Sequence, residues 1–244
     1  MKNNAEFDCY AESYDRTLNE GLAVSGESRQ YFAEARVKWL ADCLLRLRSA
    51  PSIVIDYGCG TGSTSPLLLK SLTAKKVIGI DASVRSIEVA RREFASERVQ
   101  FSSLQEFEPE GDADLVYCNG VFHHIPPEDR SSALQFVDRT LRPGGLFSLW
   151  ENNPWNPGTQ YVMARLPFDR DAIKLSAVES RRLVQSERLS VLRTDFVFFF
   201  PRFFKILRPF EKFISGLPFG AQYQILCRKP MRSFTGSSAE GRPS

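Results

Sequence analysis

Short apolar runs alternate with helix-like segments from residue 52 to residue 152, and this alternation limits the fold more than any other feature of the 244-residue chain. Each run is rich in aliphatic and β-branched side chains and is bounded by turn residues, which is typical of a buried strand. The predicted strands cover 52–57, 76–81, 98–103, 112–120 and 146–152, and the predicted helices cover 66–72, 83–95 and 127–141. Strands that alternate with helices form βαβ crossovers. We therefore predict an α/β fold, a doubly wound, Rossmann-like, mainly parallel sheet with helices on both faces.

The chain on either side of this core carries further elements. An amphipathic helix is predicted over 31–47, and Pro51 follows its end. After the core, a helix over 176–189 precedes two apolar runs, at 191–200 and 222–229. The two runs are expected to pair as an antiparallel edge of the sheet.

These patterns divide the chain into three predicted regions around a single domain. Residues 1–50 are predicted to form an N-terminal helical lid or cap. Residues 51–232 form the main domain, which includes an aromatic and basic insertion at about 196–219. Residues 233–244 have the polar, small-residue composition of a disordered tail.

Charge and cysteine content exclude several classes of function. The chain has 32 Lys and Arg against 29 Asp and Glu, and its formal net charge of +3 is too balanced for a dedicated nucleic-acid binder. The five cysteines include no CxxC pair, which argues against a disulfide framework and a structural zinc site, so we predict no metal. The first residues lack the apolar stretch of a signal peptide, so we expect a cytoplasmic protein.

The most specific motif is DYGCGTG, which directly follows the first predicted strand. It places Asp56 two residues before the first of three glycines, Gly58, Gly60 and Gly62. Glycines at alternate positions let the backbone turn sharply and let a ligand approach it closely. A dinucleotide-binding loop would have its third glycine at position 63, which is Ser63, so a nicotinamide dehydrogenase is disfavoured.

This motif resembles the first motif of class I S-adenosylmethionine-dependent methyltransferases of the type 11/25-like group, and the resemblance covers about 50–151. It implies S-adenosylmethionine as cofactor and methyl transfer as activity. By this resemblance, the glycine loop wraps the methionine part of the cofactor, and Asp56 helps to orient its amino group. The helix after the loop is predicted to have Ser65 at its N-cap and Pro66 at its first position.

The nucleoside part of the cofactor is predicted to lie at the end of the second strand. Asp81 ends VIGID, where a carboxylate can accept hydrogen bonds from both ribose hydroxyls, and Ala82 would lie beside the adenine. Ser83 is available to cap the next helix, which leaves Asp81 for the ligand. Many relatives have an Asp on the third strand for the adenine amino group, and here Gln105, Glu106 or a backbone carbonyl is left to serve.

Further candidates for the cofactor site come from the fourth strand and the N-terminal region. Asn119 ends the fourth predicted strand, at the edge where an open α/β sheet binds ligands. In relatives, a segment like the N-terminal one folds over the cofactor. By this resemblance Tyr10 or Tyr14 closes the pocket, and Arg36 meets the cofactor carboxylate.

Three residues are candidates for the acceptor side of the reaction. His123 and His124 are the two histidines of the chain and follow the fourth strand, and Glu151 lies at the tip of the fifth. Imidazole is the usual side chain that takes a proton near pH 7, so either histidine could act as general base. The same histidines could instead only form the pocket wall, and Glu151 is a competing base or acceptor ligand. These alternatives stay open.

The insertion at 196–219 holds nine of the nineteen phenylalanines. Eight Lys and Arg against two acids between 193 and 233 give this part a local charge of +6. One interpretation is a covering element whose phenylalanines pack on the sheet. The other is peripheral contact with a membrane, or a lipidic acceptor, because bulky apolar residues mixed with cations suit the boundary of an anionic bilayer.

Together these features predict an S-adenosylmethionine-dependent methyltransferase that acts on a small-molecule or lipidic acceptor. The residues leave open whether O, N or C receives the methyl group. The alternative is a catalytically silent cofactor-binding scaffold that docks through its basic aromatic insertion.

Overall fold

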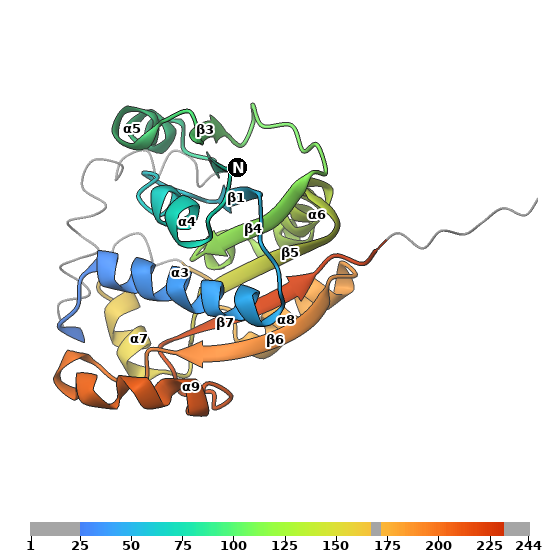
Figure 1. The fold of residues 1–244 in the computed structure, drawn as a ribbon. Coiled ribbons are helices and arrows are strands. Elements are labelled where there is room, and N and C mark those ends of the chain that lie inside the picture. The colour runs from blue at the N-terminus through green and yellow to red at the C-terminus, as the bar shows by residue number, and fades with distance from the viewer. Residues whose placement is uncertain (1–24, 167–171, 232–244) are drawn as a thin grey trace, which may run out of the picture.

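The computed structural model describes residues 25–166 and 172–231, which form one seven-stranded sheet covered by helices (Figure 1). The strands are β1 (Ile53–Tyr57), β2 (Lys76–Asp81), β3 (Val99–Ser103), β4 (Ala113–Asn119), β5 (Leu141–Asn152), β6 (Ser190–Val197) and β7 (Gln222–Arg228). The α-helices are α3 (Arg29–Arg46), α4 (Ser65–Ser71), α5 (Val84–Phe94), α6 (Arg130–Thr140), α7 (Pro157–Met163), α8 (Ala177–Ser186) and α9 (Glu211–Ile214). The 3₁₀ segments are η2 (Phe122–His124), η3 (Pro127–Asp129) and η5 (Arg202–Phe210).

The strand order is β3-β2-β1-β4-β5-β7-β6. The first five strands in this order pair in parallel, whereas β7 is antiparallel to both β5 and β6. This confirms the predicted fold class. Successive crossovers run outward from β1 in one direction and from β4 in the other. In an open α/β sheet, ligands bind at such a switch point, outside the carboxyl ends of the strands.

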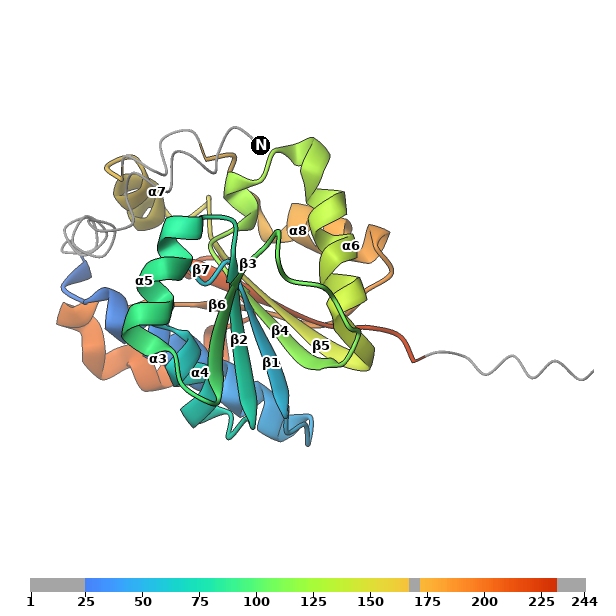
Figure 2. The ribbon, with the colours of Figure 1, turned by 90° about the horizontal axis from the view of Figure 1, so that it is seen from above.

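Helices cover both faces of the sheet, with α3, α4 and α5 on one face and α6 and α8 on the other (Figure 2). Adjacent strand residues serve opposite faces. Val54 packs with Leu40 of α3, and Ile55 packs in the cluster that holds Leu134 of α6. The helix α3 therefore shares the main hydrophobic core, although it comes from the first fifty residues.

The start of α4 differs from its prediction. Thr64 occupies the N-cap and makes no side-chain cap bond, while Ser65 is already the first helical residue. The Ser65 hydroxyl instead donates to Oδ2 of Asp56 at 2.7 Å, because that buried carboxyl needs a donor. At α5 the predicted cap is confirmed, since Ser83 Oγ accepts a hydrogen bond from the Ser86 amide.

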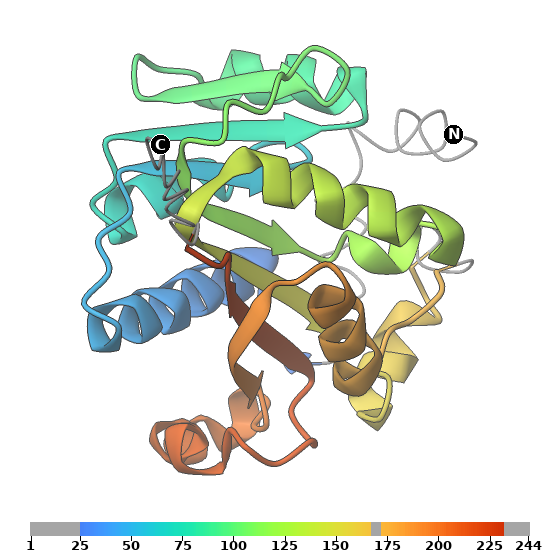
Figure 3. The same ribbon diagram turned by 90° about the vertical axis from the view of Figure 1, so that its right-hand side faces the viewer.

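The segment between β6 and β7 lies at the outer edge of the sheet, below α7 and β6 in Figure 1 and at the lower edge of Figure 3. The strand β6 ends at Val197, three residues before its predicted end. Phe198 has φ +62° and turns the chain out of the sheet. Over residues 25–166 and 172–231, the structure contains no helix of sufficient length and apolar content to cross a membrane.

Candidate functional site

The loop between β1 and α4 holds three glycines in left-handed backbone conformations. Their φ angles are +73° at Gly58, +54° at Gly60 and +84° at Gly62, a region that side chains with a Cβ rarely adopt. A Cβ at Gly58 would lie 2.3 Å from Val121 Cγ2, and one at Gly62 would lie 2.7 Å from Ala90 Cβ. A Cβ at Gly60 would meet no described atom within 4 Å. Packing thus requires two of the glycines, and Gly60 leaves its backbone accessible to a ligand.

Asp81, at the end of β2, joins this loop through its carboxylate. Its Oδ2 accepts a hydrogen bond from the Gly60 amide at 2.8 Å, and its Oδ1 accepts one from the Ser83 amide at 2.9 Å. Ala82 follows and is half-buried. The two residues predicted to contact the nucleoside therefore lie beside the glycine loop, and the ribose and adenine contacts themselves stay predictions.

Asp56 lies in β1 beneath the loop, with 2% of its surface exposed. Burial is the main cause that raises the pKa of Asp56 to about 7, and the nearby charge of Asp81 acts in the same direction. The Ser65 hydroxyl and the positive charges of Arg29 and Arg36 lower it in part. Because a nearby cation favours the ionised form, an ammonium group bound beside Asp56 would lower this pKa.

Two buried polar atoms near the loop have no hydrogen-bond partner among the described residues. They are Thr61 Oγ1, in the loop itself, and Asn119 Oδ1, at the end of β4. Buried polar atoms in native proteins nearly always have a partner. With the accessible backbone at Gly60, they fit a ligand that carries hydroxyl and amino groups, as S-adenosylmethionine does.

Arg36 extends from α3 to the tips of β4 and β7. Its Nε donates to the Tyr117 hydroxyl at 3.3 Å, and its Nη1 donates to Gln222 Oε1 at 3.0 Å. The side chain is buried at the edge of the same cavity as Asn119. Its contact with a cofactor carboxylate stays a prediction, and Tyr10 and Tyr14 lie outside the described residues.

His123 and Glu151 form a buried pair. Glu151, near the end of β5, accepts a hydrogen bond from the Phe122 amide at 2.8 Å through Oε1, and its Oε2 lies 2.5 Å from His123 Nδ1. The exposed fractions are 4% for His123 and 2% for Glu151. The Glu151 carboxyl group thus engages the Nδ1 side of the His123 ring. The His124 ring lies beside it, at a centroid distance of 4.0 Å.

The short turn that carries both histidines is held from behind. Arg130 Nε donates to the carbonyls of Phe122 and Ile125 at 3.1 and 3.0 Å, and its Nη2 donates to the carbonyl of Ile173 at 2.8 Å. The Ile173 amide in turn donates to the His123 carbonyl at 2.8 Å. These bonds hold the backbone of the turn that carries the His123 ring.

A cavity of about 460 Å³ opens in front of the histidines, within the size range of small-molecule sites. Its polar lining contains Arg36 of α3, Asn119, Asn152 and Gln222 at strand tips, and His123 and His124 of η2. Its apolar wall contains Phe32, Met163, Leu166, Phe198, Phe199, Phe200 and Phe203. One ligand could thus place a polar group at His123 and an apolar body against the phenylalanines.

The phenylalanine wall is fixed by Glu211 of α9 and by Arg208. The Glu211 carboxylate accepts three backbone hydrogen bonds, from the amides of 198–200, each at 3.1 Å. Burial raises the pKa of Glu211, and the three backbone hydrogen bonds oppose this effect. Arg208 forms a 2.9 Å ion pair with Glu27 and lies 4.6 Å from the centre of the Tyr31 ring.

The structure brings most of the sequence candidates to one edge of the sheet, in two groups. One group surrounds the glycine loop, and the other faces the cavity. Glu151 lies behind His123 and is absent from the cavity lining among the described residues. Glu106, considered for the adenine, pairs with Arg91 at 3.4 Å and is mostly exposed. Sequence reasoning missed Phe32, Arg208 and Gln222, because no local motif marks residues that meet only in the folded chain.

Comparison with known proteins agrees with this geometry. A family model described as a methyltransferase domain matches residues 54–145. A trans-aconitate 2-methyltransferase from Methylobacterium nodulans is 31% identical over 163 residues, which are 64% of this chain and 61% of the relative. One from Azoarcus sp. is 27% identical over 144 residues, 58% of this chain and 56% of the relative. The chain thus spans little more than half the length of the curated relatives it matches.

Solved structures show the same fold. A S-adenosylmethionine-dependent methyltransferase from Thermotoga maritima, described as a possible histamine N-methyltransferase, has a TM-score of 0.61 and 20% identity, and covers 91% of this chain and 98% of its own. A putative methyltransferase solved with the Trm112 activator of Haloferax volcanii has a TM-score of 0.63 and 16% identity, with 92% and 98% covered.

The glycine loop, the sheet order and these matches define the class. Residues 54–145 are similar to a methyltransferase domain, and the chain has the fold of S-adenosylmethionine-dependent methyltransferases.

Proposed function

We propose that this protein transfers a methyl group from S-adenosylmethionine to a small molecule that has a hydroxyl group on an apolar body. The observation that carries the proposal is the cavity, whose lining contains both the phenylalanines and His123, the residue that contacts the buried Glu151. A scaffold without activity would have no use for a buried carboxylate that orients a histidine at the cavity surface.

The residues around the glycine loop would hold the cofactor. Gly60 offers its backbone, Asp81 a carboxylate for the ribose, and Asp56 a carboxyl for the amino group. Asn119, with its unpartnered oxygen, lies between this loop and the cavity. When bound, the cofactor supplies an electrophilic methyl group on a sulfonium, and the protein's contribution is to bring the acceptor oxygen into line with it.

His123 would act as the general base. Its Nε2 would accept the proton that the acceptor hydroxyl loses as its oxygen is methylated. The imidazolium that results is stabilised by the adjacent carboxylate of Glu151, which also keeps the ring in the correct tautomer. Glu151 is thus a positioning residue that acts through His123.

The names of the relatives suggest a different acceptor, trans-aconitate, which is a polycarboxylate. Two of the arginines at the cavity are already engaged within the protein: Arg208 pairs with Glu27, and Arg36 binds Gln222 and Tyr117. The family model covers residues 54–145, whereas the residues of the phenylalanine wall lie before or after it in sequence. These observations favour an apolar, lipidic acceptor over a polyanion.

A methyl-transfer assay with isotope-labelled S-adenosylmethionine tests the proposal. The acceptors would be trans-aconitate, long-chain and phenolic alcohols, and the aqueous and organic-solvent fractions of a cell extract. We expect label in the alcohols or the organic fraction, as an ether stable to mild base. Label in trans-aconitate alone, as a base-labile ester, would overturn the acceptor class. Binding of S-adenosylhomocysteine with no transfer to any fraction would overturn the activity.

A further inference from the structure

The segment between β6 and β7 exposes an unusual number of apolar side chains. Eight of the sixteen exposed large hydrophobic residues in the described part of the chain lie between 203 and 219. We call these eight the outer aromatic surface: Phe203, Phe204, Ile206, Leu207, Phe210, Phe213, Leu217 and Phe219, with exposed fractions of 37% to 80%. Such a concentration on one short segment marks an interaction site rather than scattered surface residues.

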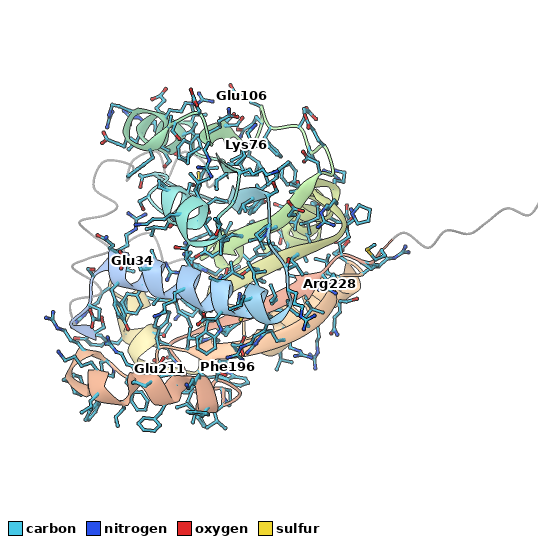
Figure 4. All side chains as sticks on the ribbon, viewed as in Figure 1. Glu34, Lys76, Glu106, Phe196, Glu211 and Arg228 are labelled. Carbon is cyan, nitrogen blue, oxygen red and sulfur yellow. The ribbon has the colours of Figure 1, made fainter. Side chains whose placement is uncertain are left out.

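The positive and negative side chains of this segment lie on different sides of it. Arg202, Lys205 and Lys212 are exposed among the apolar side chains. Glu211, the one acid between 196 and 219, has its carboxylate bound to the backbone amides of 198–200, toward the protein (Figure 4 labels this residue). The exposed side is therefore apolar and cationic, with no carboxylate of its own segment to offset the cations.

The inner side of the segment is anchored, so the exposed residues cannot simply fold back onto the sheet. Ser215 is buried, and its carbonyl accepts a hydrogen bond from the Phe196 amide at 2.7 Å. Asn156 Nδ2 donates to the Phe219 carbonyl at 2.8 Å. Arg208 is held by its ion pair with Glu27. The outward direction of the aromatic residues follows from these bonds.

The outer aromatic surface is continuous with the cavity. Phe203 lines the cavity and is also 73% exposed, and its neighbour Pro201 lines the cavity as well. A partner that covers this surface would therefore also cover Phe203, a residue of the cavity lining.

We propose that the outer aromatic surface docks the protein on an anionic lipid bilayer. Phenylalanines that enter the acyl boundary and cations that meet the headgroups are the two contributions that such docking needs. A second copy of the chain fits less well, because a two-fold contact would bring the same cations together. The docked protein would open its cavity toward lipid, which agrees with an apolar acceptor, but the docking does not depend on methyl transfer.

One segment of the chain itself is a competing occupant. Residues 1–24, which lie outside the described residues, contain five acids and two bases, a charge opposite to that of the outer aromatic surface. The experiment must therefore use the full chain and must report whether this segment covers the surface.

Co-sedimentation with vesicles tests the proposal. The full chain would be mixed with phosphatidylcholine vesicles with and without about one quarter phosphatidylglycerol, at about 0.1 M and 1 M salt. We expect binding that requires the anionic lipid and weakens at high salt. Arg202→Gln with Lys205→Gln and Lys212→Gln should weaken it about a hundredfold, since each cation near an anionic surface contributes about fivefold.

Two further variants separate charge from insertion. Ile206→Ser with Phe213→Ser removes apolar side chains that do not line the cavity, and it should weaken binding at both salt concentrations at least tenfold. Lys70→Gln with Lys75→Gln and Arg182→Gln removes three exposed cations elsewhere and should change binding little. Equal losses in the two cation variants would mean attraction by net charge alone and would overturn the proposed surface.

The remaining outcomes also decide the matter. No binding of the full chain to anionic vesicles at low salt would overturn the proposal. A dimer that the Ile206→Ser, Phe213→Ser variant dissociates would then identify a second copy as the occupant. Binding that begins only after removal of residues 1–24 would identify that segment instead. Because sedimentation needs no methyl transfer, the result is independent of the assay for the proposed function.

Discussion

The cofactor side and the acceptor side of this molecule are built in different ways. Around the glycine loop, the contacts are local: Ser65 binds Asp56 nine positions away, and Asp81 binds Gly60 across 21 positions. Around the cavity, local contacts such as those of Glu211 with the amides of 198–200 are joined by long-range ones, and Arg36 binds Gln222 across 186 positions.

This difference shows what a family likeness can transfer. The family model matches residues 54–145, and both partners of the Asp56–Ser65 and Gly60–Asp81 contacts lie in that range. The similarity therefore supports the cofactor directly. The phenylalanine wall and the residues that fix it lie outside that match. The acceptor must therefore be inferred from the cavity itself.

The largest expected effect separates the two sides at His123. The variant His123→Ala should lose about a hundredfold or more in kcat, because it removes the proposed base, while affinity for S-adenosylhomocysteine stays within about twofold. Turnover and calorimetry on the same preparation measure both quantities.

His124→Ala is the matched control for that variant, since it changes the neighbouring ring and leaves the 2.5 Å contact between Glu151 and His123 Nδ1 in place. Its loss in kcat should be much smaller. Small and similar losses in kcat for both variants would mean that the histidines only form the pocket wall. A loss of cofactor affinity in both variants would mean that the cofactor side and the acceptor side form one site.

The next effect is on the cofactor side. Asp81→Asn should lower affinity for S-adenosylhomocysteine at least tenfold, because hydrogen bonds to a charged group are each worth roughly 1.5–3 kcal/mol. The amide keeps an oxygen that accepts from one of the two backbone amides, so the fold should survive. Calorimetry measures the affinity, and an unchanged value in a folded variant would remove the ribose assignment.

A pH-dependent effect on stability should follow from Asp56. Below about pH 4, near its ordinary pKa of 3.8, folded and unfolded chains both hold the proton; from there to the folded pKa of about 7 only the folded chain retains it. The buried carboxyl therefore costs stability increasingly as the pH rises through this window, roughly 1.4 kcal/mol per pH unit, and the cost levels off above it.

Asp56→Asn removes this titration and keeps a similar shape. Its melting temperature should exceed that of the unmodified chain by a margin that grows between about pH 4.5 and 7.5, as thermal unfolding would measure. Glu211→Gln is the corresponding variant on the acceptor side, because burial also raises the pKa of the Glu211 carboxyl group. A margin that stays constant with pH for Asp56→Asn would contradict the raised pKa.

The same local and long-range division explains what the sequence could predict. Alternating strands and helices determine the sheet, and Val54 and Ile55 face opposite sides as a period of two requires. The sequence predicts Ser65 as a helix cap, but its hydroxyl donates a hydrogen bond to Asp56 instead. The sequence pattern does not show that the Asp56 carboxyl group is buried beside the start of this helix. The partnership of Glu151 with His123 depends on the pairing of β4 with β5, so both residues could be proposed but not their contact.

The phenylalanines of 196–219 are a second case in which the sequence could not predict the outcome. Composition alone left open whether those of 196–219 cover the sheet or face outward. The structure divides them: Phe196 is buried in the core, Phe199 lines the cavity, and Phe213 is 74% exposed. A turn at Phe198 with positive φ and the inward carboxylate of Glu211 set this division, and neither follows from a periodic pattern.

The smallest expected effect lies at Arg208, on the acceptor side. Its guanidinium pairs with Glu27, lies over Tyr31 and donates to the Phe200 carbonyl at 3.2 Å, and each of these contacts is worth about 0.5–1 kcal/mol. Arg208→Gln should therefore loosen one wall of the cavity without unfolding the chain.

We expect the acceptor KM of Arg208→Gln to rise about two- to fivefold, with kcat and S-adenosylhomocysteine affinity nearly unchanged, because no described contact links Arg208 to the glycine loop. Arg182→Gln, which removes an exposed cation of α8 away from the cavity lining, should leave the KM as it is. If Arg208→Gln weakens cofactor binding as much as acceptor binding, the phenylalanine wall and the glycine loop are coupled. The cofactor side and the acceptor side would then not be independent.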